Sequence, residues 1–432
     1  MNLDDRYVPA IHLNLNVRGL GPSATLAINE RCAQLAHEGR DVFRLGLGQS
    51  PFPVPQPVVD ELKAQAHQKA YLPVKGLREL REAVAQYHRR QEGVEYSGAD
   101  VLIGPGSKEL MFLVQLVYYG DLVIPTPSWV SYAPQAAIIG RHVRWVPTRA
   151  EDGWRITPEA LDRLCRPDPT RPRILILNYP NNPAGTTYGP DELEALAEVA
   201  RRYRVILISD EIYGELHFHG RHASIARFYP EGTIISAGLS KWAGAGGWRL
   251  GTFTFPPSLR WLLDAMAAVA SETYTSTSAP IQYAAIRAYQ GGLEIERYLH
   301  NSRRILRALA QRLHGMLTAA GIDCAAPEGG FYLFPDFCPL RERLARRGIT
   351  ASGELCDRLL EETGVAILPG TDFGRPAAEL TARLAFVDFD GARALVAAEA
   401  VPPHQELDDD FLETYCGRVL AAVQRVVDWT AD

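Results

Sequence analysis

A glycine-rich stretch, Gly238–Gly251, places Lys241 and Arg249 eight residues apart, with mostly small residues between them. Such residues let the backbone pass close to a bound group and leave both charged side chains free to point at it. A lysine that is partly buried beside another cation loses its proton more easily, and its amine can then condense with an aldehyde. The pattern therefore indicates carbonyl chemistry at Lys241. The alternative is a glycine-rich turn that carries an ordinary surface Lys–Arg pair.

A second stretch that could bind a ligand follows the apolar run Val101–Ile103. The next residues contain two glycines, Ser107 and Lys108, and they open an apolar helix that we expect to reach Tyr119. Free backbone amides at a helix start, together with small residues and a hydroxyl, form an anion site. A plain strand-to-helix turn capped by Ser107 is the alternative.

Strands that alternate with helices must position these residues. Continuous apolar runs at 122–124, 173–177 and 205–209, separated by helices, indicate a parallel sheet that is covered on both faces. Polar segments follow two of these runs, at 178–185 and at 210–213. Because strand ends of a parallel sheet meet at its carboxyl edge, these segments converge where such sheets bind ligands.

The two ends of the chain have a different character. Residues 23–38 show helical spacing with Ser23 as N-cap, and the apolar stretch 13–20 is expected to border the pocket. From about residue 290, an Arg/Leu-rich helix precedes an aromatic run at 330–334 and a strand at 381–386. This half indicates a smaller α+β domain, completed by the N-terminal segment. The acidic segment 399–410 is predicted to be an insertion before the last helix.

Two clusters of charged side chains have simpler explanations than a ligand site. Three histidines, His217, His219 and His222, alternate with other residues in an expected hairpin, so structural histidines are favoured over a metal site. The arginines of the long helix share one amphipathic face, which is typical of a solvated surface rather than a nucleic-acid patch. These arginines are Arg303, Arg304, Arg307 and Arg312.

Composition narrows the function classes. The 432 residues suggest two or three domains, and a net charge of −6 gives no electrostatic footprint for nucleic acid or an anionic membrane. We expect no signal peptide and no membrane span. The six cysteines are scattered without a Cys-x-x-Cys pair, which favours reduced thiols in a cytoplasmic protein.

With these elements in order, the chain resembles the class I/II aminotransferases of fold type I, which depend on pyridoxal 5′-phosphate (PLP). The resemblance rests on Gly-x-Ser-Lys followed by Trp-Arg-Leu-Gly, preceded in order by Asn-Asn-Pro-Ala-Gly and Asp-Glu-x-Tyr, and it extends from the helix at Ser23 to Arg383. It implies an α/β fold with a mostly parallel seven-stranded sheet between helices. Residues 51–290 would form this large PLP-binding domain, and residues 1–50 with 291–432 the small α+β domain.

The resemblance also implies roles for the residues that would surround the cofactor ring. Lys241 would form the internal aldimine and then move the proton between Cα and the cofactor. Asp210 would pair with the pyridine nitrogen, and Trp129 would stack on the ring. Tyr213 and Asn182 would hydrogen-bond the 3′-oxygen of the ring.

Further implied roles concern the phosphate and the substrate. The amides of Ser107 and Lys108 would bind the phosphate with Arg249, and either Ser236 or Ser240 would add a hydroxyl. The resemblance places Tyr71 against the phosphate of a neighbouring subunit, which makes a homodimer the expected unit. Arg383 would bind the substrate α-carboxylate in a bidentate pair, Asn182 would assist, and Gly48 would leave room for the substrate.

The implied reaction moves an amino group between an L-amino acid and a 2-oxo acid. A PLP-dependent lyase that performs β-elimination would use the same residues, because the protein decides which bond at Cα breaks. The fold also serves as an effector-binding module in transcription regulators, but only some twenty residues precede the first helix here. Amino-acid metabolism without nucleic acid, membrane or metal is therefore the prediction, and the side-chain specificity stays open.

Overall fold

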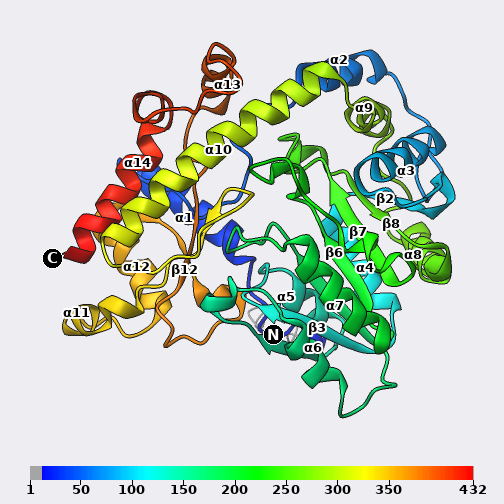
Figure 1. The fold of residues 1–432 in the computed structure, drawn as a ribbon, viewed down its shortest axis with the longest axis horizontal. Helices are drawn as coiled ribbons and strands as arrows, with labels where there is room; N and C mark the ends of the chain where they lie inside the picture. The colour runs from blue at the N-terminus through cyan, green and yellow to red at the C-terminus, as the bar shows by residue number, and fades with distance from the viewer. Residues whose placement is uncertain (1–11, 432) are drawn as a thin grey trace, which may run out of the picture.

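The computed structural model describes residues 12–431, and its centre is a seven-stranded sheet with the order β2-β8-β7-β6-β5-β3-β4 (Figure 1). Neighbours from β7 to β4 are parallel, whereas β8 runs antiparallel to both β7 and β2. The predicted mostly parallel seven-stranded sheet is therefore confirmed. The strands are β2 (Val101–Gly104), β3 (Asp121–Thr126), β4 (Val143–Pro147), β5 (Arg173–Asn178), β6 (Ile206–Asp210), β7 (Thr233–Gly238) and β8 (Gly251–Thr254).

Helices cover both faces of this sheet because successive strand residues point to opposite sides. Leu122 and Ile124 pack with residues of α4 and α8, whereas Val123 between them packs with residues of α6 and α7. At the β2–β8 end, Val101 and Ile103 face the cluster that contains α3 and α9. The helices are α2 (Gln56–Gln65), α3 (Arg78–Glu92), α4 (Ser107–Val117), α5 (Tyr132–Ile138), α6 (Pro158–Cys165), α7 (Pro190–Arg202), α8 (Arg260–Glu272) and α9 (Ala279–Gln290).

Helix α7 illustrates how local sequence sets the element boundaries. Pro190 occupies its first turn, where a missing N–H costs nothing, and the carboxylate of Glu192 accepts a bond from the Gly189 amide at 2.8 Å. Two arginines stand in its last turn, so the charges at both ends complement the helix dipole.

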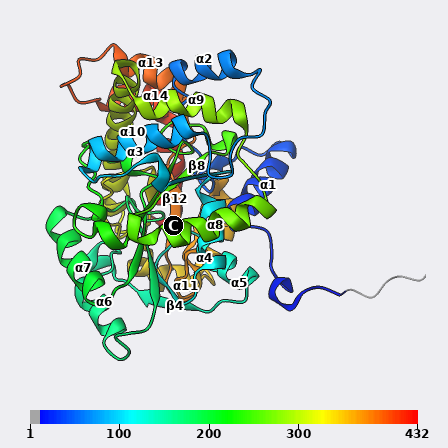
Figure 2. The same ribbon diagram turned by 90° about the vertical axis from the view of Figure 1, so that its right-hand side faces the viewer.

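The N-terminal segment and the C-terminal part of the chain build two smaller sheets. Strand β1 pairs in parallel with β10, and a three-stranded sheet has the order β11-β12-β9. Figure 2 shows α13 and α14 with α10 behind the large sheet's helices. The elements are α1 (Ala24–His37), β1 (Phe43–Arg44), α10 (Leu293–Ala319), β9 (Tyr332–Leu333), α11 (Arg341–Arg346), α12 (Ser352–Thr363), β10 (Val365–Ala366), β11 (Leu368–Pro369), β12 (Ala382–Ala385), α13 (Gly391–Glu399) and α14 (Asp409–Ala431).

The prediction of a solvated arginine face on α10 holds for Arg312, which is exposed, and is wrong for Arg304. Arg304 is only 6% exposed, and its guanidinium donates to the carbonyl oxygens of Pro402 and Gln405 at 3.1 and 2.7 Å. Arg303 pairs with the carboxylate of Glu215. The segment between α13 and α14, predicted from the sequence to be an insertion, is held against α10 by Arg304 through main-chain carbonyls.

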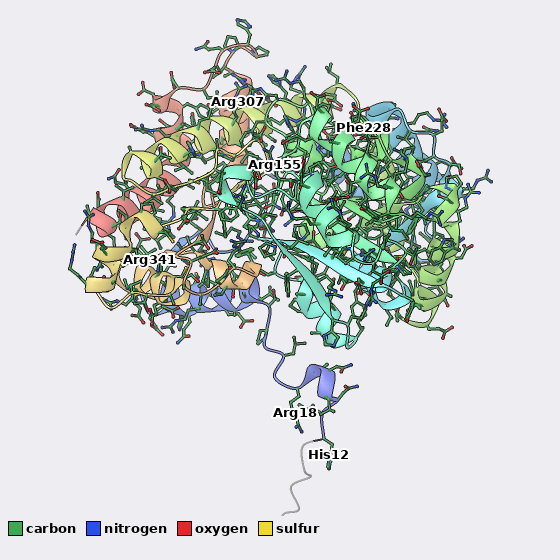
Figure 3. All side chains as sticks on the ribbon, turned by 60° about the horizontal axis from the view of Figure 1, so that its bottom comes forward. His12, Arg18, Arg155, Phe228, Arg307 and Arg341 are labelled. Atoms are coloured by element: carbon green, nitrogen blue, oxygen red, sulfur yellow. The ribbon has the colours of Figure 1, made fainter. Side chains whose placement is uncertain are left out.

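Two further local expectations are wrong. The histidine segment does not form a hairpin. His217 forms a β-bridge with Gly329, and the residues directly after His217 form turns. Residues 13–20 do not border the cavity described below. Figure 3 shows His12 and Arg18 away from the body of the chain, and Leu15 is 77% exposed.

Within residues 12–431, the longest helices are too polar to cross a lipid bilayer. A cytoplasmic location stays a prediction.

Candidate active site

The polar segments at the carboxyl ends of the strands line one cavity of about 580 Å³. It brings together eleven of the thirteen residues that the sequence singled out, from both ends of the chain and from the large sheet, and leaves out Ser236 and Tyr71. The eleven are Gly48, Ser107, Lys108, Trp129, Asn182, Asp210, Tyr213, Ser240, Lys241, Arg249 and Arg383. Tyr71 does not join them, because it lies between α2 and α3 with 91% of its surface exposed.

Lys241 lies just beyond β7, half-buried among aromatic rings. Its Nζ donates to the carbonyl oxygen of Gly48 at 2.7 Å and lies 5.7 Å from the ring centre of Tyr213. Burial, and after it the positive charges of Arg383 and Arg249, lower the pKa of Lys241 to about 8. A substantial fraction of neutral amine therefore exists near neutral pH, as nucleophilic chemistry requires.

Asp210 ends β6 and is buried with a hydrogen-bond donor on each carboxylate oxygen. The hydroxyl of Tyr132 donates to Oδ2 at 2.5 Å, and that of Ser236 donates to Oδ1 at 3.2 Å. Burial raises the pKa of Asp210 to about 6, and both donors act against this rise. The site thus holds a carboxylate that is poised to accept a proton or to pair with a cation.

Arg383 lies on β12 and is among the largest fully buried side chains of the described residues. Its Nη1 donates to Asn182 Oδ1 at 3.2 Å, another nitrogen bonds the carbonyl of Gly46, and Nε has no hydrogen-bond partner. The guanidinium carbon lies 4.8 and 5.1 Å from the ring centres of Tyr332 and Phe373. No carboxylate of residues 12–431 forms a salt bridge with it. A buried cation without an acidic partner is costly, so the arrangement suits an incoming carboxylate.

An anion cradle lies at the other end of the cavity, where α4 begins. Gly106 caps this helix at φ +93°, and a Cβ there would lie 2.2 Å from Nη2 of Arg249. A Cβ on Gly251 would lie 2.1 Å from the amide nitrogen of Ser107. Gly106 therefore lets the guanidinium approach the helix start, and Gly251 lets the backbone of β8 approach it. Lys108 follows Ser107 and also lines the cavity, and its pKa is lowered by burial and by Arg249.

Residues 40–396 match the family described as "Aminotransferase class I and II". The chain belongs to this family. The predicted family, fold and activity are confirmed: the protein is an aminotransferase that acts on amino acids and oxo acids.

Relatives of this aminotransferase are similar over most of their length. Aspartate aminotransferase of Geobacillus stearothermophilus is 37% identical over 374 residues, which cover 83% of this chain and 91% of the relative. The aspartate/prephenate aminotransferase of Thermus thermophilus is 34% identical, with 84% and 91% covered. Among solved structures, aspartate aminotransferase from Thermus thermophilus with maleate gives a TM-score of 0.81 at 30% identity, covering 97% of this chain and all of that one.

The aminotransferase needs glycine at position 48 for a steric reason. A Cβ there would lie 1.9 Å from the hydroxyl oxygen of Tyr332, which itself hydrogen-bonds the Tyr213 hydroxyl at 2.8 Å. Gly238, three residues before Lys241, is restricted as well, because a Cβ would lie 2.8 Å from the Leu250 carbonyl oxygen. That position therefore carries no hydroxyl, and only Ser240 of the two candidate serines lines the cavity.

Sequence reasoning missed two tyrosines of the aminotransferase site, Tyr132 and Tyr332. Tyr132 follows the predicted Trp129 by three residues, and Tyr332 lies in the aromatic run of the C-terminal half. Proximity to Trp129 was a usable signal for Tyr132. Nothing local marked Tyr332, because its hydroxyl reaches the site only through the packing of β9 against β12.

Proposed function

We propose that this aminotransferase binds PLP at Lys241 and uses a dicarboxylic L-amino acid, such as aspartate, as its amino donor. One observation carries the proposal: Lys241, Asp210 and Arg383 face a single cavity that also contains a cradle for an anion. An amine with a lowered pKa, a buried carboxylate and an unpaired guanidinium are the groups that amino transfer to an oxo acid needs.

The residues of the cavity fit PLP in charge and shape. The start of α4 with Ser107, Ser240 and Arg249 would hold the phosphate, and the flat face of Trp129 would support the ring. Asp210 would pair with the ring nitrogen, while Tyr213 and Asn182 would hold the ring oxygen. When bound, PLP supplies the electron sink that makes the Cα–H bond of the attached amino acid acidic.

The chain itself supplies proton transfer and orientation. The Lys241 amine, neutral in part because of its lowered pKa, would take the proton from the substrate Cα and return it. Arg383 would bind the α-carboxylate through two parallel bonds, and the Nε without a partner is available for one of them. The buried aromatic groups around both residues exclude water and strengthen these charged contacts.

Lys108 supports the dicarboxylic class. Its Nζ lies 5.6 Å from the ring centre of Trp129, and within residues 12–431 it forms no salt bridge with a carboxylate. Since Arg383 would bind the α-carboxylate, a second cation in the same cavity offers a partner for a side-chain carboxylate. The relatives whose names include aspartate or prephenate, both dicarboxylic, point the same way.

The subunit organisation belongs to the same proposal. We assign residues 51–290 to a large domain and residues 1–50 with 291–432 to a small one, because the pairing of β1 with β10 joins the two separate segments of the small domain. We also assign a homodimer in which Tyr71, exposed in its own chain, reaches the partner's phosphate site. Hydrogen exchange that protects the two domains as separate units would support the division, and a single cooperative unit would contradict it.

A single-turnover experiment tests the function. PLP-loaded enzyme, mixed with one amino acid and no oxo acid, should lose its visible absorption band with L-aspartate or L-glutamate and keep it with L-leucine. Adding oxaloacetate or 2-oxoglutarate should restore the band. Continuous release of ammonia and oxo acid from a β-substituted amino acid, with the visible band persisting, would instead establish a lyase.

A charge-removing substitution tests the substrate class separately. Lys108→Met should weaken the binding of aspartate by about 10- to 100-fold, the range for a lost hydrogen bond between charged groups. The affinity for PLP and the reaction with a monocarboxylic amino acid should change much less. Equal losses for both kinds of substrate would assign Lys108 to the phosphate instead.

A further inference from the structure

Tyr132, the first residue of α5, points its hydroxyl at the carboxylate of Asp210 from inside the core. We propose that Tyr132 is a positioning residue that keeps Asp210 ionised and turned toward the cofactor site; the cofactor part of this inference rests on the proposed function. Tyr132 is 1% exposed, and Asp210 is the partner that its buried hydroxyl bonds.

The two oxygens of Asp210 are held by donors from two different elements. Tyr132 on α5 donates to Oδ2 at 2.5 Å, and Ser236 on β7 donates to Oδ1 at 3.2 Å. A carboxylate with one donor on each oxygen cannot rotate without breaking a bond, and each oxygen keeps a lone pair for a third partner. The shorter bond belongs to Tyr132, so this residue contributes more to the orientation.

The charges around Asp210 make the donor necessary. Burial is the largest influence on its pKa and raises it, and the neighbouring Glu211 raises it further. The bonds from Tyr132 and Ser236, together with the amide of Ile212, lower it, and the ammonium of Lys241 interacts favourably with the carboxylate. Burial and Asp210 raise the pKa of Tyr132 well above its usual value. Tyr132 therefore stays protonated and remains a donor.

The loop before α5 connects this donor to the face on which the ring would stack. The rings of Trp129 and Tyr132 meet edge to face with centres 5.2 Å apart, and the Tyr132 amide donates to the Trp129 carbonyl oxygen at 3.2 Å. One short segment thus carries a flat aromatic surface and the donor that holds Asp210. A displacement of Tyr132 would change both the orientation and the ionisation of the carboxylate.

The cofactor-free protein gives a direct test. Infrared spectra against pH should show the C=O stretch of protonated Asp210, assigned by its absence in Asp210→Asn. In Tyr132→Phe the midpoint of the Asp210 titration should rise by about 1–2 pH units. This is the shift that the loss of one hydrogen bond to a charged group produces. Ser236→Ala should give a smaller rise, because its bond is longer.

Two controls separate this role from a loss of packing. Tyr289→Phe removes another buried hydroxyl, one that lies 3.5 Å from Thr252, and it should leave the Asp210 midpoint unchanged. A 3-fluorotyrosine at position 132 keeps the ring and donates more strongly, so the midpoint should fall. An unchanged Asp210 midpoint in a folded Tyr132→Phe protein, or in the fluorinated protein if Tyr132→Phe does not fold, would overturn the proposal.

A second readout examines the cofactor part. With PLP labelled by ¹⁵N at the ring nitrogen, the chemical shift should report a protonated nitrogen in the unmodified enzyme and partial loss of that proton in Tyr132→Phe. The acid limb of the activity profile should move to higher pH with it. If the infrared midpoint shifts but PLP does not bind, the proposed function fails while the link between Tyr132 and Asp210 stands.

Discussion

The amine of Lys241 donates to the carbonyl oxygen of Gly48 at 2.7 Å, across 193 positions of sequence. Two residues before Gly48, the carbonyl of Gly46 accepts a bond from Arg383. One short segment near the N-terminus therefore holds both the nucleophile and the carboxylate-binding cation. An incoming ligand must replace these bonds, so the segment at 46–48 and the large sheet together determine the geometry of the site.

Lys241 should be the only lysine that borohydride reduction links to PLP, and Lys241→Ala should bind PLP only non-covalently with catalysis almost abolished. The rate at which cofactor-free enzyme attaches PLP should rise with pH and level off above about 8, because the neutral amine is the nucleophile. Stopped-flow absorbance measures this rate. A profile still rising at pH 10 would mean that the pKa of Lys241 is not lowered.

Arg383→Lys should weaken the binding of the amino acid and of the oxo acid alike, by about 1.5–3 kcal/mol. The reason is that lysine cannot form two parallel bonds to a carboxylate. Spectral titrations measure both affinities, and the spectrum of the bound cofactor should not change. Arg375→Lys is a matched control, since Arg375 is a half-buried arginine that pairs with Glu379 at 2.8 Å. Unaltered affinities in Arg383→Lys would move the carboxylate site elsewhere.

Tyr71 should act in the neighbouring subunit. A mixture of Lys241→Ala with a Tyr71→Phe variant weakened in phosphate binding should contain heterodimers with one site that has both native residues. Activity should therefore rise above the sum of the two parents once subunits have exchanged. If exchange is demonstrated by a mass tag and activity stays at that sum, Tyr71 does not contribute across an interface.

His222→Gln should destabilise the protein in a pH-dependent way. His222 Nε2 lies 2.9 Å from Glu211 Oε2 in a buried ion pair, and removing one partner costs about 3 kcal/mol. Burial alone would lower the pKa of His222, but the carboxylates of Glu211, Glu92 and Glu215 raise it above 6.5. This contribution is therefore fully present below pH 6.5 and is lost as pH rises through the raised pKa.

Chemical denaturation of both proteins against pH measures this difference. The difference in unfolding free energy between the unmodified protein and His222→Gln should be largest between pH 4.5 and 6.5. At more acidic pH, Glu211 becomes protonated as pH falls through its lowered pKa, and the ion pair is lost. His88→Gln serves as the control with the opposite sign. Burial lowers the pKa of His88 to about 4. The contribution of neutral His88 to the unfolding free energy therefore grows as pH rises toward 6.5. A difference for His222→Gln that does not depend on pH would contradict the ion pair.

The sequence determined the fold class and most of the site, for a local reason. Asp210 ends a strand, and Ser107, Asn182 and Lys241 lie in the segments that follow strands. Parallel strands must bring their carboxyl ends to one edge. Their chemistry could therefore be predicted without knowing the packing. The sequence also indicated that Gly106 and Gly251 let another group come close to the backbone. It did not indicate which group that is.

The tertiary structure alone decided which side chains lose contact with water. Arg304 lies on an amphipathic helix and Arg383 on a short strand, yet packing buries both, one against main-chain carbonyls and one between aromatic rings. Tyr132 is a local neighbour of Trp129, but its bond to Asp210 depends on how α5 packs against β6. Burial and partner choice come from contacts between residues far apart in the chain, and no local pattern encodes them.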